Sequence, residues 1–249
     1  MTAARGNGRT PEAGGELGDA PERWPVESSA FSLRTGRVID IREDVVASGG
    51  QRFTRDVVVH PGAVGIIALD EQERMLLVRQ YRHPVGQRLY EPPAGLLDIE
   101  GEDYLAAAQR ELYEEGHVRA RDWRVLVDAF TSPGMTTESL RIYLARGITD
   151  VPPQDRHNGI DEEADMPVSW APLADVVAGV FAGRLHNPTL VMGSMAAWAA
   201  RNGAGYDALR AGDAPWPVRD EIPYDLLARP PLRCRRFRRF ASRRRTPWS

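Results

Sequence analysis

The chain has 249 residues and a hydrophobic content of 42%, with a formal net charge of −3 at pH 7. This length suits one large domain with tails or two small domains, and a charge so close to zero favours no particular partner. The single cysteine, Cys234, excludes an intramolecular disulfide framework and is typical of a reducing, cytoplasmic setting.

The N-terminal end of the chain is predicted to be a disordered leader. Residues 1–28 are rich in Gly, Pro, Ala and Glu without hydrophobic periodicity, and they lack the apolar run of a secretory signal. The whole chain also lacks an apolar run of about 18 residues, so we expect no membrane span.

Residues 204–249 are predicted to form a Pro- and Arg-rich tail. From Arg229 onward the tail holds nine Arg and no acidic residue, with Phe237, Phe240 and Trp248 interleaved. This composition is compatible with an arm that binds nucleic acid or an anionic membrane. We prefer a solvated, disordered extension, because nothing else in the chain supports a nucleic-acid function.

The residues between these ends carry strand patterns first and helical patterns later. Strands are predicted at 31–37, 38–46, 53–60, 63–69 and 75–80, and again at 123–130, 139–146 and 167–170. The polar connection DEQER between the fourth and fifth strands predicts a hairpin. Helices are predicted at about 103–115, 172–182 and 188–201. This order has no regular βαβ repeat, so it indicates an α+β fold or an α/β sandwich.

The predicted helix at 103–115 carries three acidic residues near its C-terminal end, Glu111, Glu114 and Glu115. At about 100° per residue, these carboxylates adjoin the core-facing stripe instead of lying opposite it. The stripe consists of Leu105, Ala108 and Leu112. Like charges at this spacing repel by roughly a few tenths of a kcal/mol per pair, and the helix dipole also disfavours them there. A bound divalent cation would explain the cluster; a solvated acidic face is the alternative.

Gly95, Glu102 and the run RELYEE at 110–115 resemble the Nudix box, whose pattern is Gly, five residues, Glu, seven residues, Arg-Glu-aliphatic-any-Glu-Glu-any-Gly-aliphatic. One extra residue separates Gly95 from Glu102, and His117 occupies the position of the second glycine. We expect Gly116, one place early, to supply the left-handed residue after the helix. The segment from about Phe31 to Arg201 is similar to Nudix hydrolases of the ADP-ribose pyrophosphatase group.

The resemblance implies a three-layer α/β/α sandwich with a mixed sheet, preceded by an N-terminal antiparallel sheet. The hydrolase domain would span residues 29–203. Residues 29–60 would supply strands that pack against a second copy of the chain in a homodimer, with the adenosine bound near the interface.

The resemblance also implies a metal site that holds Mg²⁺, with Mn²⁺ as an alternative. Glu111 and Glu115 would be the main ligands, joined by the backbone carbonyl of Ala94 and by the auxiliary ligands Glu102 and Glu114. These oxygen donors suit Mg²⁺. Arg110 would pair with one of the glutamates and hold it in place.

Three features outside the box favour ADP-ribose as the substrate. The stretch LVRQYRHPVGQRLYEPPAGLLD is similar to the segment that precedes the box in this group, although Pro92 replaces the more usual Leu. Pro133 lies at the spacing beyond Val118 that the group shares. The acidic stretch IDEEADM resembles a mobile loop that delivers a catalytic, metal-binding glutamate, which maps best onto Glu163 and second best onto Glu162. A plain solvated connection is the alternative for this stretch.

The same resemblance places a set of residues against the substrate. They are Arg79, Gln80, Arg82, Glu91, Pro133, Gly134, Met135 and Glu138. For the first four of them, ordinary polar positions at the end of a sheet are the alternative.

The implied reaction is the Mg²⁺-dependent hydrolysis of ADP-ribose to AMP and ribose 5-phosphate. One alternative is a pyrophosphatase for another nucleoside diphosphate sugar or for a dinucleotide. Another, from a different class, is a non-catalytic Nudix domain that senses ADP-ribose and controls a DNA-binding module. The intact acids of the box and the short segment after Arg201 argue against the sensor.

Overall fold

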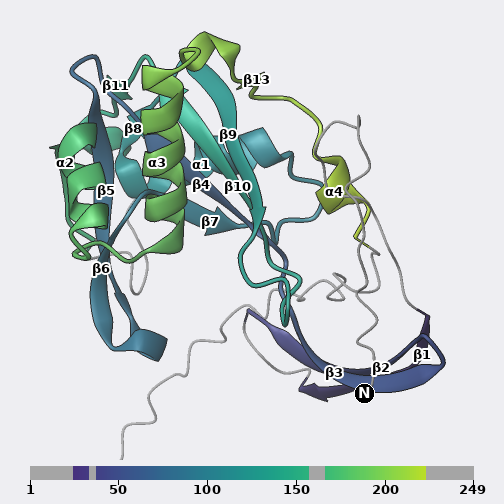
Figure 1. Ribbon diagram of the computed structural model, residues 1–249. Coiled ribbons are helices and arrows are strands. Elements are labelled where there is room, and N and C mark those ends of the chain that lie inside the picture. Colours follow the sequence, from purple (N-terminus) through teal and green to yellow (C-terminus); the bar gives the residue numbers. More distant parts are fainter. Residues whose placement is uncertain (1–24, 34–37, 157–165, 223–249) are drawn as a thin grey trace, which may run out of the picture.

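The computed structural model of the protein describes residues 25–33, 38–156 and 166–222. These residues form two parts, a small N-terminal sheet and a larger α/β body from which the sheet projects (Figure 1). Within the described ranges, no helix combines the length and the apolar character that a membrane span requires.

The body is built on a mixed five-stranded sheet in the order β13-β9-β10-β4-β7. Its strands are β4 (Ala63–Ala68), β7 (Ala94–Leu96), β9 (Asp122–Phe130), β10 (Ser139–Arg146) and β13 (Arg210–Ala211). Strands β4 and β10 are parallel, and the other pairs are antiparallel. The mixed sheet that the resemblance implied is therefore confirmed.

A second sheet in the body has the order β12-β5-β6. It consists of β5 (Arg74–Arg82), β6 (Gln87–Glu91) and β12 (Val168–Pro172), and the 3-10 helix η1 (His83–Val85) joins β5 to β6. The hairpin predicted between 63–69 and 75–80 is wrong, because β4 and β5 meet only at the bridge between Leu69 and Met75 and then enter different sheets. A two-stranded ladder of β8 (Val118–Arg119) and β11 (Thr149–Asp150), followed by the 3-10 helix η2 (Pro153–Asp155), completes this part.

Helices cover both faces of the sheet. Helix α1 (Tyr104–Gly116) packs on one face, and α2 (Leu173–Phe181) and α3 (Pro188–Asn202) pack on the other. Successive side chains of a strand point to opposite faces. In β4, Ile66 accordingly packs in the cluster of α1, whereas Ile67 packs in the cluster of α2 and α3. Full burial of each such side chain stabilises the fold by roughly 1.5–3 kcal/mol, and the three-layer sandwich is confirmed.

The N-terminal sheet consists of β1 (Val26–Leu33), β2 (Asp40–Ser48) and β3 (Gln51–Val59), all antiparallel. A two-residue turn at Gly49 and Gly50 joins β2 to β3, and both glycines have the positive φ that such a turn needs. Strand β1 begins within the predicted leader 1–28, so the last residues of that range belong to a strand and not to a leader. Residues 1–24 lie outside the described ranges.

The segment after α3 differs from the prediction of a tail that starts at residue 204. It forms the 3-10 helix η4 (Tyr206–Ala208), strand β13 and the short helix α4 (Pro217–Asp220). Tyr206 and Trp216 are buried within it. Residues 204–222 are therefore not a disordered tail, and the Arg-rich residues from 223 onward lie outside the described part.

Candidate functional site

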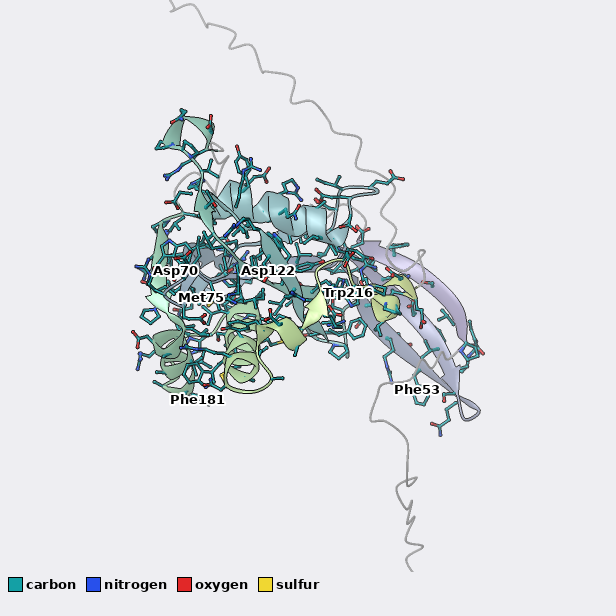
Figure 2. The ribbon with its side chains drawn as sticks, turned by 90° about the horizontal axis from the view of Figure 1, so that it is seen from above. Phe53, Asp70, Met75, Asp122, Phe181 and Trp216 are labelled. Atoms are coloured by element: carbon teal, nitrogen blue, oxygen red, sulfur yellow. The ribbon has the colours of Figure 1, made fainter. Side chains whose placement is uncertain are left out.

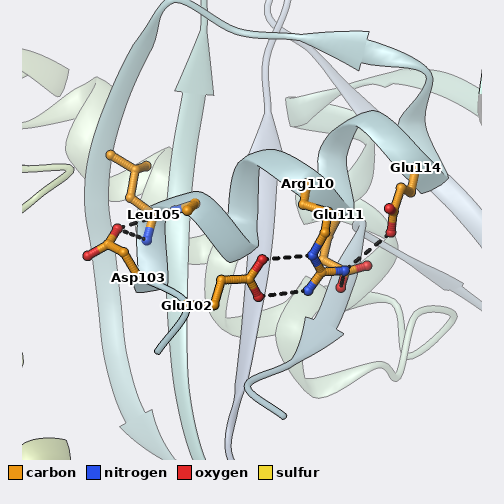
Figure 3. Close-up of polar contacts among 7 residues, drawn as sticks. Glu102, Asp103, Leu105, Arg110, Glu111 and Glu114 are labelled. Atoms are coloured by element: carbon orange, nitrogen blue, oxygen red, sulfur yellow. Dashed lines mark hydrogen bonds and ion pairs between the residues drawn. The ribbon is translucent and has the colours of Figure 1, made fainter. Parts of the chain in front are cut away.

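Helix α1 begins at a side-chain cap. The Asp103 carboxylate oxygen Oδ1 accepts hydrogen bonds from the backbone N–H groups of Leu105, at 2.9 Å, and Ala106, at 3.2 Å (Figure 3). An aspartate at this position satisfies helix donors that have no partner within the helix. The cap fixes where the helix starts, and with it the direction in which the acids of its last turns project.

The guanidinium of Arg110 lies among three carboxylates (Figure 3). It forms a bidentate pair with Glu102, at 2.9 and 3.0 Å, and its Nη1 lies 2.5 Å from Glu111 Oε1 and 3.2 Å from Glu114 Oε2. The hydrogen bonds to Glu102 and the charge of Glu111 raise the pKa of Arg110, against burial, which lowers it. The pairing expected between Arg110 and a glutamate of the box is present, with three partners instead of one.

Glu111 lies against the backbone of strand β7. A Cβ atom on Gly95 would come within 2.0 Å of both Cδ and Oε1 of Glu111, so only a glycine leaves room for the carboxylate here. Glu111 is also one of the few buried acidic residues among those described, at 8% exposure. The first glycine of the motif therefore has a steric role, because it lets a carboxylate lie on the sheet edge.

Glu115 reaches the same strand from the next turn of α1. Its Oε2 accepts a hydrogen bond of 3.0 Å from the backbone N–H of Ala94. The structure thus brings Ala94 and Glu115 together, although the contact uses the N–H of Ala94 and not the carbonyl that we expected to bind a metal.

The donor set of this cluster fits a hard divalent cation. Three carboxylates share one guanidinium, so negative charge is in excess, and all the side-chain donors are oxygens of the kind that Mg²⁺ and Mn²⁺ prefer. In the described part of the chain, no three His, Cys, Asp or Glu side chains are already grouped as a metal site. The carboxylates instead contact Arg110 and the N–H of Ala94.

The end of α1 differs from the expectation. His117, and not Gly116, takes the left-handed conformation that ends the helix, with φ 55° and ψ 31°. Gly116 is the last helical residue, and a Cβ atom there would lie 3.2 Å from Leu112 and 3.4 Å from Leu76. The glycine therefore allows close packing of the helix on β5, and histidine is one of the residues that tolerate the left-handed region.

Four of the expected substrate residues lie on the hairpin of β5 and β6. Arg82 forms a bidentate pair with the buried carboxylate of Glu91, at 2.8 and 2.5 Å. The guanidinium of Arg79 lies 5.1 Å from the centre of the Tyr90 ring, in a cation–π contact. Gln80, between the two arginines, is half-buried. The hairpin leads directly through two prolines to Ala94, so it adjoins the acidic cluster along the chain.

The other expected substrate residues lie in the connection between β9 and β10, which carries Pro133, Gly134, Met135 and Glu138. The backbone carbonyl of Met135 accepts a 2.8 Å hydrogen bond from the N–H of Val58, so this loop is joined to the N-terminal sheet. Pro133, Gly134 and Met135 are exposed.

Glu138 has two partners that the sequence did not indicate. Thr131 donates a hydrogen bond of 2.5 Å to its Oε2, and His60 Nε2 lies 3.8 Å from its Oε1. His60 Nδ1 accepts a hydrogen bond from the Gly62 N–H, which places the ring proton on Nε2, toward Glu138. Thr131 lies only seven residues before Glu138, whereas His60 comes from a distant part of the chain that no local sequence signal marks. Glu163 and Glu162, the expected acids of the loop, lie outside the described residues.

The chain matches one protein-family model and is similar in sequence to several known proteins. A model of the NUDIX domain matches residues 59–189, more than half of the chain. An ADP-ribose pyrophosphatase from Mycobacterium tuberculosis is 43% identical over 176 residues, which cover 70% of this chain and 84% of that protein. A methanol dehydrogenase activator from Bacillus methanolicus is 36% identical over 159 residues, which cover 64% and 84% of the two chains.

The fold has a match among solved structures. A crystal structure described as an ADP compounds hydrolase superposes with a TM-score of 0.59 and 19% sequence identity, and the match covers 75% of this chain and 99% of the other. At this identity the likeness concerns the fold.

Proposed function

Because the chain belongs to the NUDIX family of hydrolases, we propose that it hydrolyses the diphosphate of ADP-ribose to AMP and ribose 5-phosphate with the help of Mg²⁺. The observation that carries the proposal is the excess of carboxylates around Arg110, at the C-terminal end of a helix, where the helix dipole and mutual repulsion disfavour acidic residues. The 43% identity to an ADP-ribose pyrophosphatase supports ADP-ribose as the proposed substrate.

We propose Glu111 and Glu115 as the main metal ligands, with the Ala94 carbonyl, Glu102 and Glu114 as further ligands. A bound Mg²⁺, or Mn²⁺ in its place, would offset the negative charge of the diphosphate and make a bound water more acidic. To bind it, the carboxylates must exchange part of their contact with Arg110 and Ala94 for contact with the cation.

Arg110 has a positioning role in this proposal. Its planar guanidinium holds Glu102 by two parallel hydrogen bonds and still reaches Glu111 and Glu114. Without a cation among them, three carboxylates so close together would repel one another and spread. Arg110 therefore keeps the donors gathered before the metal arrives.

Glu163 is proposed as the group that orients or deprotonates the attacking water, with Glu162 as the second choice. The substrate would be bound by the hairpin of β5 and β6 and by the loop between β9 and β10. On the hairpin, Arg82 is held by Glu91 and its side chain is 43% exposed, so its positive charge would face an anionic ligand bound there. Arg79 and Gln80 are its neighbours on β5.

The N-terminal sheet is proposed as the contact with a second copy of the chain. It projects from the body, and strand β3 at its edge is mostly exposed (Figure 1). An exposed edge strand offers unpaired backbone groups to a partner. Because Val58 of β3 also bonds to Met135, a dimer formed here would adjoin the loop proposed to bind the substrate. We propose a cytoplasmic setting on the basis of the single cysteine.

The test is a panel of nucleoside diphosphate compounds incubated with Mg²⁺ and then with alkaline phosphatase, with release of inorganic phosphate as the signal. ADP-ribose has no terminal phosphate, so it gives a signal only after its diphosphate is cut. We expect ADP-ribose to have the highest kcat/KM. A higher value for another sugar nucleotide or a dinucleotide would keep the reaction and change the substrate. Binding of ADP-ribose without any turnover would instead support the sensor.

A further inference from the structure

The residues from 209 to 222, here named the C-terminal segment, fold back over the body beside the start of α1. The segment begins with strand β13, which pairs with β9, and ends with α4. In Figures 1 and 2, α4 and Trp216 lie on the side of the body that faces the N-terminal sheet. None of the residues proposed above for metal, substrate or catalysis belongs to this segment.

Arg141 of β10 anchors the middle of the segment. Its side chain is 1% exposed and forms a bidentate pair with Asp128, at 2.8 and 3.0 Å. Its two terminal nitrogens also donate hydrogen bonds to the carbonyls of Ala214, at 2.7 Å, and Pro215, at 3.1 Å. A buried guanidinium that donates to this many acceptors fixes the backbone that supplies them. The position of Trp216, the residue after Pro215, is therefore fixed as well.

Trp216 packs between Arg141 and Tyr104, the first residue of α1. It is 3% exposed, and the Arg141 guanidinium lies 4.7 Å from the centre of its ring. On the other side, the Tyr104 ring meets it edge-on, with centroids 5.2 Å apart. The Tyr104 hydroxyl also donates a hydrogen bond of 2.5 Å to Asp220 of α4. The start of α1 is thus held by two residues of the C-terminal segment.

Arg219 links the C-terminal segment to the start of the loop at 97–103, which precedes α1. It donates a hydrogen bond of 2.6 Å to the carbonyl of Pro61. The next residue, Gly62, accepts a 3.0 Å hydrogen bond from the N–H of Leu97, which follows β7. The loop at 97–103 is therefore held at its first residue through Gly62 and at its exit through Tyr104. Glu102, the bidentate partner of Arg110, lies within this loop.

We propose that the C-terminal segment is a positioning element for the acidic cluster, and that Trp216 is its main positioning residue. By fixing both ends of the loop at 97–103, the segment holds the Glu102 carboxylate where it can pair with Arg110. Release of the segment would let Glu102 move away from Arg110 and would change the arrangement of carboxylates that a divalent cation meets. The effect on metal binding rests on the proposed function, whereas the effect on the loop does not.

The test compares Trp216→Ala with Val218→Ala, a matched control in the same segment whose side chain is 51% exposed. The first measurement is hydrogen exchange of the backbone amides at 102–107, of which those of 102 and 105–107 are hydrogen-bonded to Ile99 or Asp103. We expect these amides to exchange at least about tenfold faster in Trp216→Ala, with the core strand β4 much less affected. Val218→Ala should match the wild type.

The second measurement is Mn²⁺ binding in the absence of substrate, followed by electron paramagnetic resonance. We expect the dissociation constant to rise about tenfold in Trp216→Ala, which is the range found when groups that orient ligands are removed. Trp216→Phe keeps an aromatic ring beside Tyr104 and should restore most of the affinity. A wild type that binds no Mn²⁺ would contradict the proposed function, while the exchange at 102–107 would still decide the role of the segment.

Two outcomes would overturn the proposal. One is unchanged exchange at 102–107 in Trp216→Ala, because the loop would then hold its place without the segment. The other is faster exchange throughout the body with unaltered Mn²⁺ binding, which would leave the segment a general contribution to stability. If Trp216→Ala does not fold, Arg219→Gln and Tyr104→Phe remove single contacts of the same segment and are judged by the same two measurements.

Discussion

Two arginines of the body, Arg110 and Arg141, show how local charge balance separates a proposed cation-binding site from a structural anchor. Arg110 faces three carboxylates and its side chain is 27% exposed. Arg141 is 1% exposed; its one carboxylate, Asp128, is shared with Arg210, and its other partners are neutral carbonyls and aromatic rings. The first cluster has negative charge left over for a cation. In the cluster around Arg141, the negative charge of Asp128 is already balanced by two arginines.

The comparison predicts that loss of the buried arginine damages the fold more than any other change considered. Arg141→Met would leave Asp128 without its bidentate partner and two carbonyls without donors, so we expect the free energy of unfolding to fall by about 3–5 kcal/mol. Urea denaturation measures this change. Arg124→Met, on the neighbouring strand, removes a more exposed pair and should cost less than about 1 kcal/mol. Equal losses in the two variants would break the distinction between the arginines.

Removal of one acid from the other cluster should act on turnover and spare the fold. Glu115→Gln removes one anionic ligand but keeps the shape of the side chain, so we expect kcat on ADP-ribose to fall at least about a hundredfold. The matched control is Glu100→Gln, an exposed residue in the loop before α1. Steady-state kinetics at saturating Mg²⁺ decides the matter, and near-normal turnover would remove Glu115 from the metal site.

Glu163 tests whether the acids of α1 are sufficient without the stretch IDEEADM. If Glu163 orients or deprotonates the water, its work belongs mainly to the transition state, so Glu163→Gln should lower kcat about a hundredfold and change KM far less. Glu162→Gln should be much milder. A severe effect of Glu162→Gln would shift the assignment by one residue. No effect of either would leave water activation to a residue such as Glu114 or to the metal.

Arg110 itself should matter less than the acids it gathers. We expect Arg110→Met to lower kcat about tenfold, because the donors spread but remain present. Arg110→Lys keeps the positive charge and loses the planar fork that holds Glu102 at two points, so it should restore only part of the activity. Full activity of the lysine variant would show that the positive charge of residue 110 is sufficient and that the planar geometry of the guanidinium is not needed.

The smallest effect concerns pH. Burial, followed by the hydrogen bond to Asp220, raises the pKa of Tyr104 from 10.0 to about 12. The folded protein therefore holds this proton more tightly than the unfolded chain, and the stabilisation is complete below pH 10 and lost as the pH rises toward 12. Tyr104→Phe should make the fall in unfolding free energy between pH 10 and 12 less steep. An unchanged slope would show that other tyrosines, such as Tyr206 with its raised pKa, govern this range.

The sequence predicted those parts of the molecule whose signal is local. Strands β4, β9 and β10 contain clusters of β-branched and aliphatic residues, and the apolar periodicity of α1 is enough to place its acids beside the core. The resemblance to the Nudix box predicted the remaining residues of the candidate metal site, from Gly95 to Glu115. Strand β6 was missed because QRLYE is polar and lies at the edge of its sheet, and β7 because it is short and follows two prolines.

The parts that could not be predicted depend on partners far away in the chain. The C-terminal segment has no periodic pattern and is held by Arg141 and Tyr104, which lie well before it in the sequence. The hairpin prediction failed because β4 and β5 find other partners in two sheets. At the end of α1, the preference of glycine for the left-handed region was overridden, since close packing on Leu76 needs Gly116 within the helix.

The parallel pairing of β4 with β10 has a consequence for how the chain folds. Ala63 pairs with Leu140, so the central pair of strands must wait until the long stretch between them has been synthesised and brought round. Closing such a loop costs conformational entropy before the stabilising contact forms, and contacts between distant residues slow folding. Helix α1 lies inside this loop, so it can form early as a helix, but the core on which it packs is complete only when Tyr143 and Ala145 of β10 arrive. We expect a nascent chain that ends before β10 to leave the apolar side chains of β4 exposed and in need of protection from aggregation.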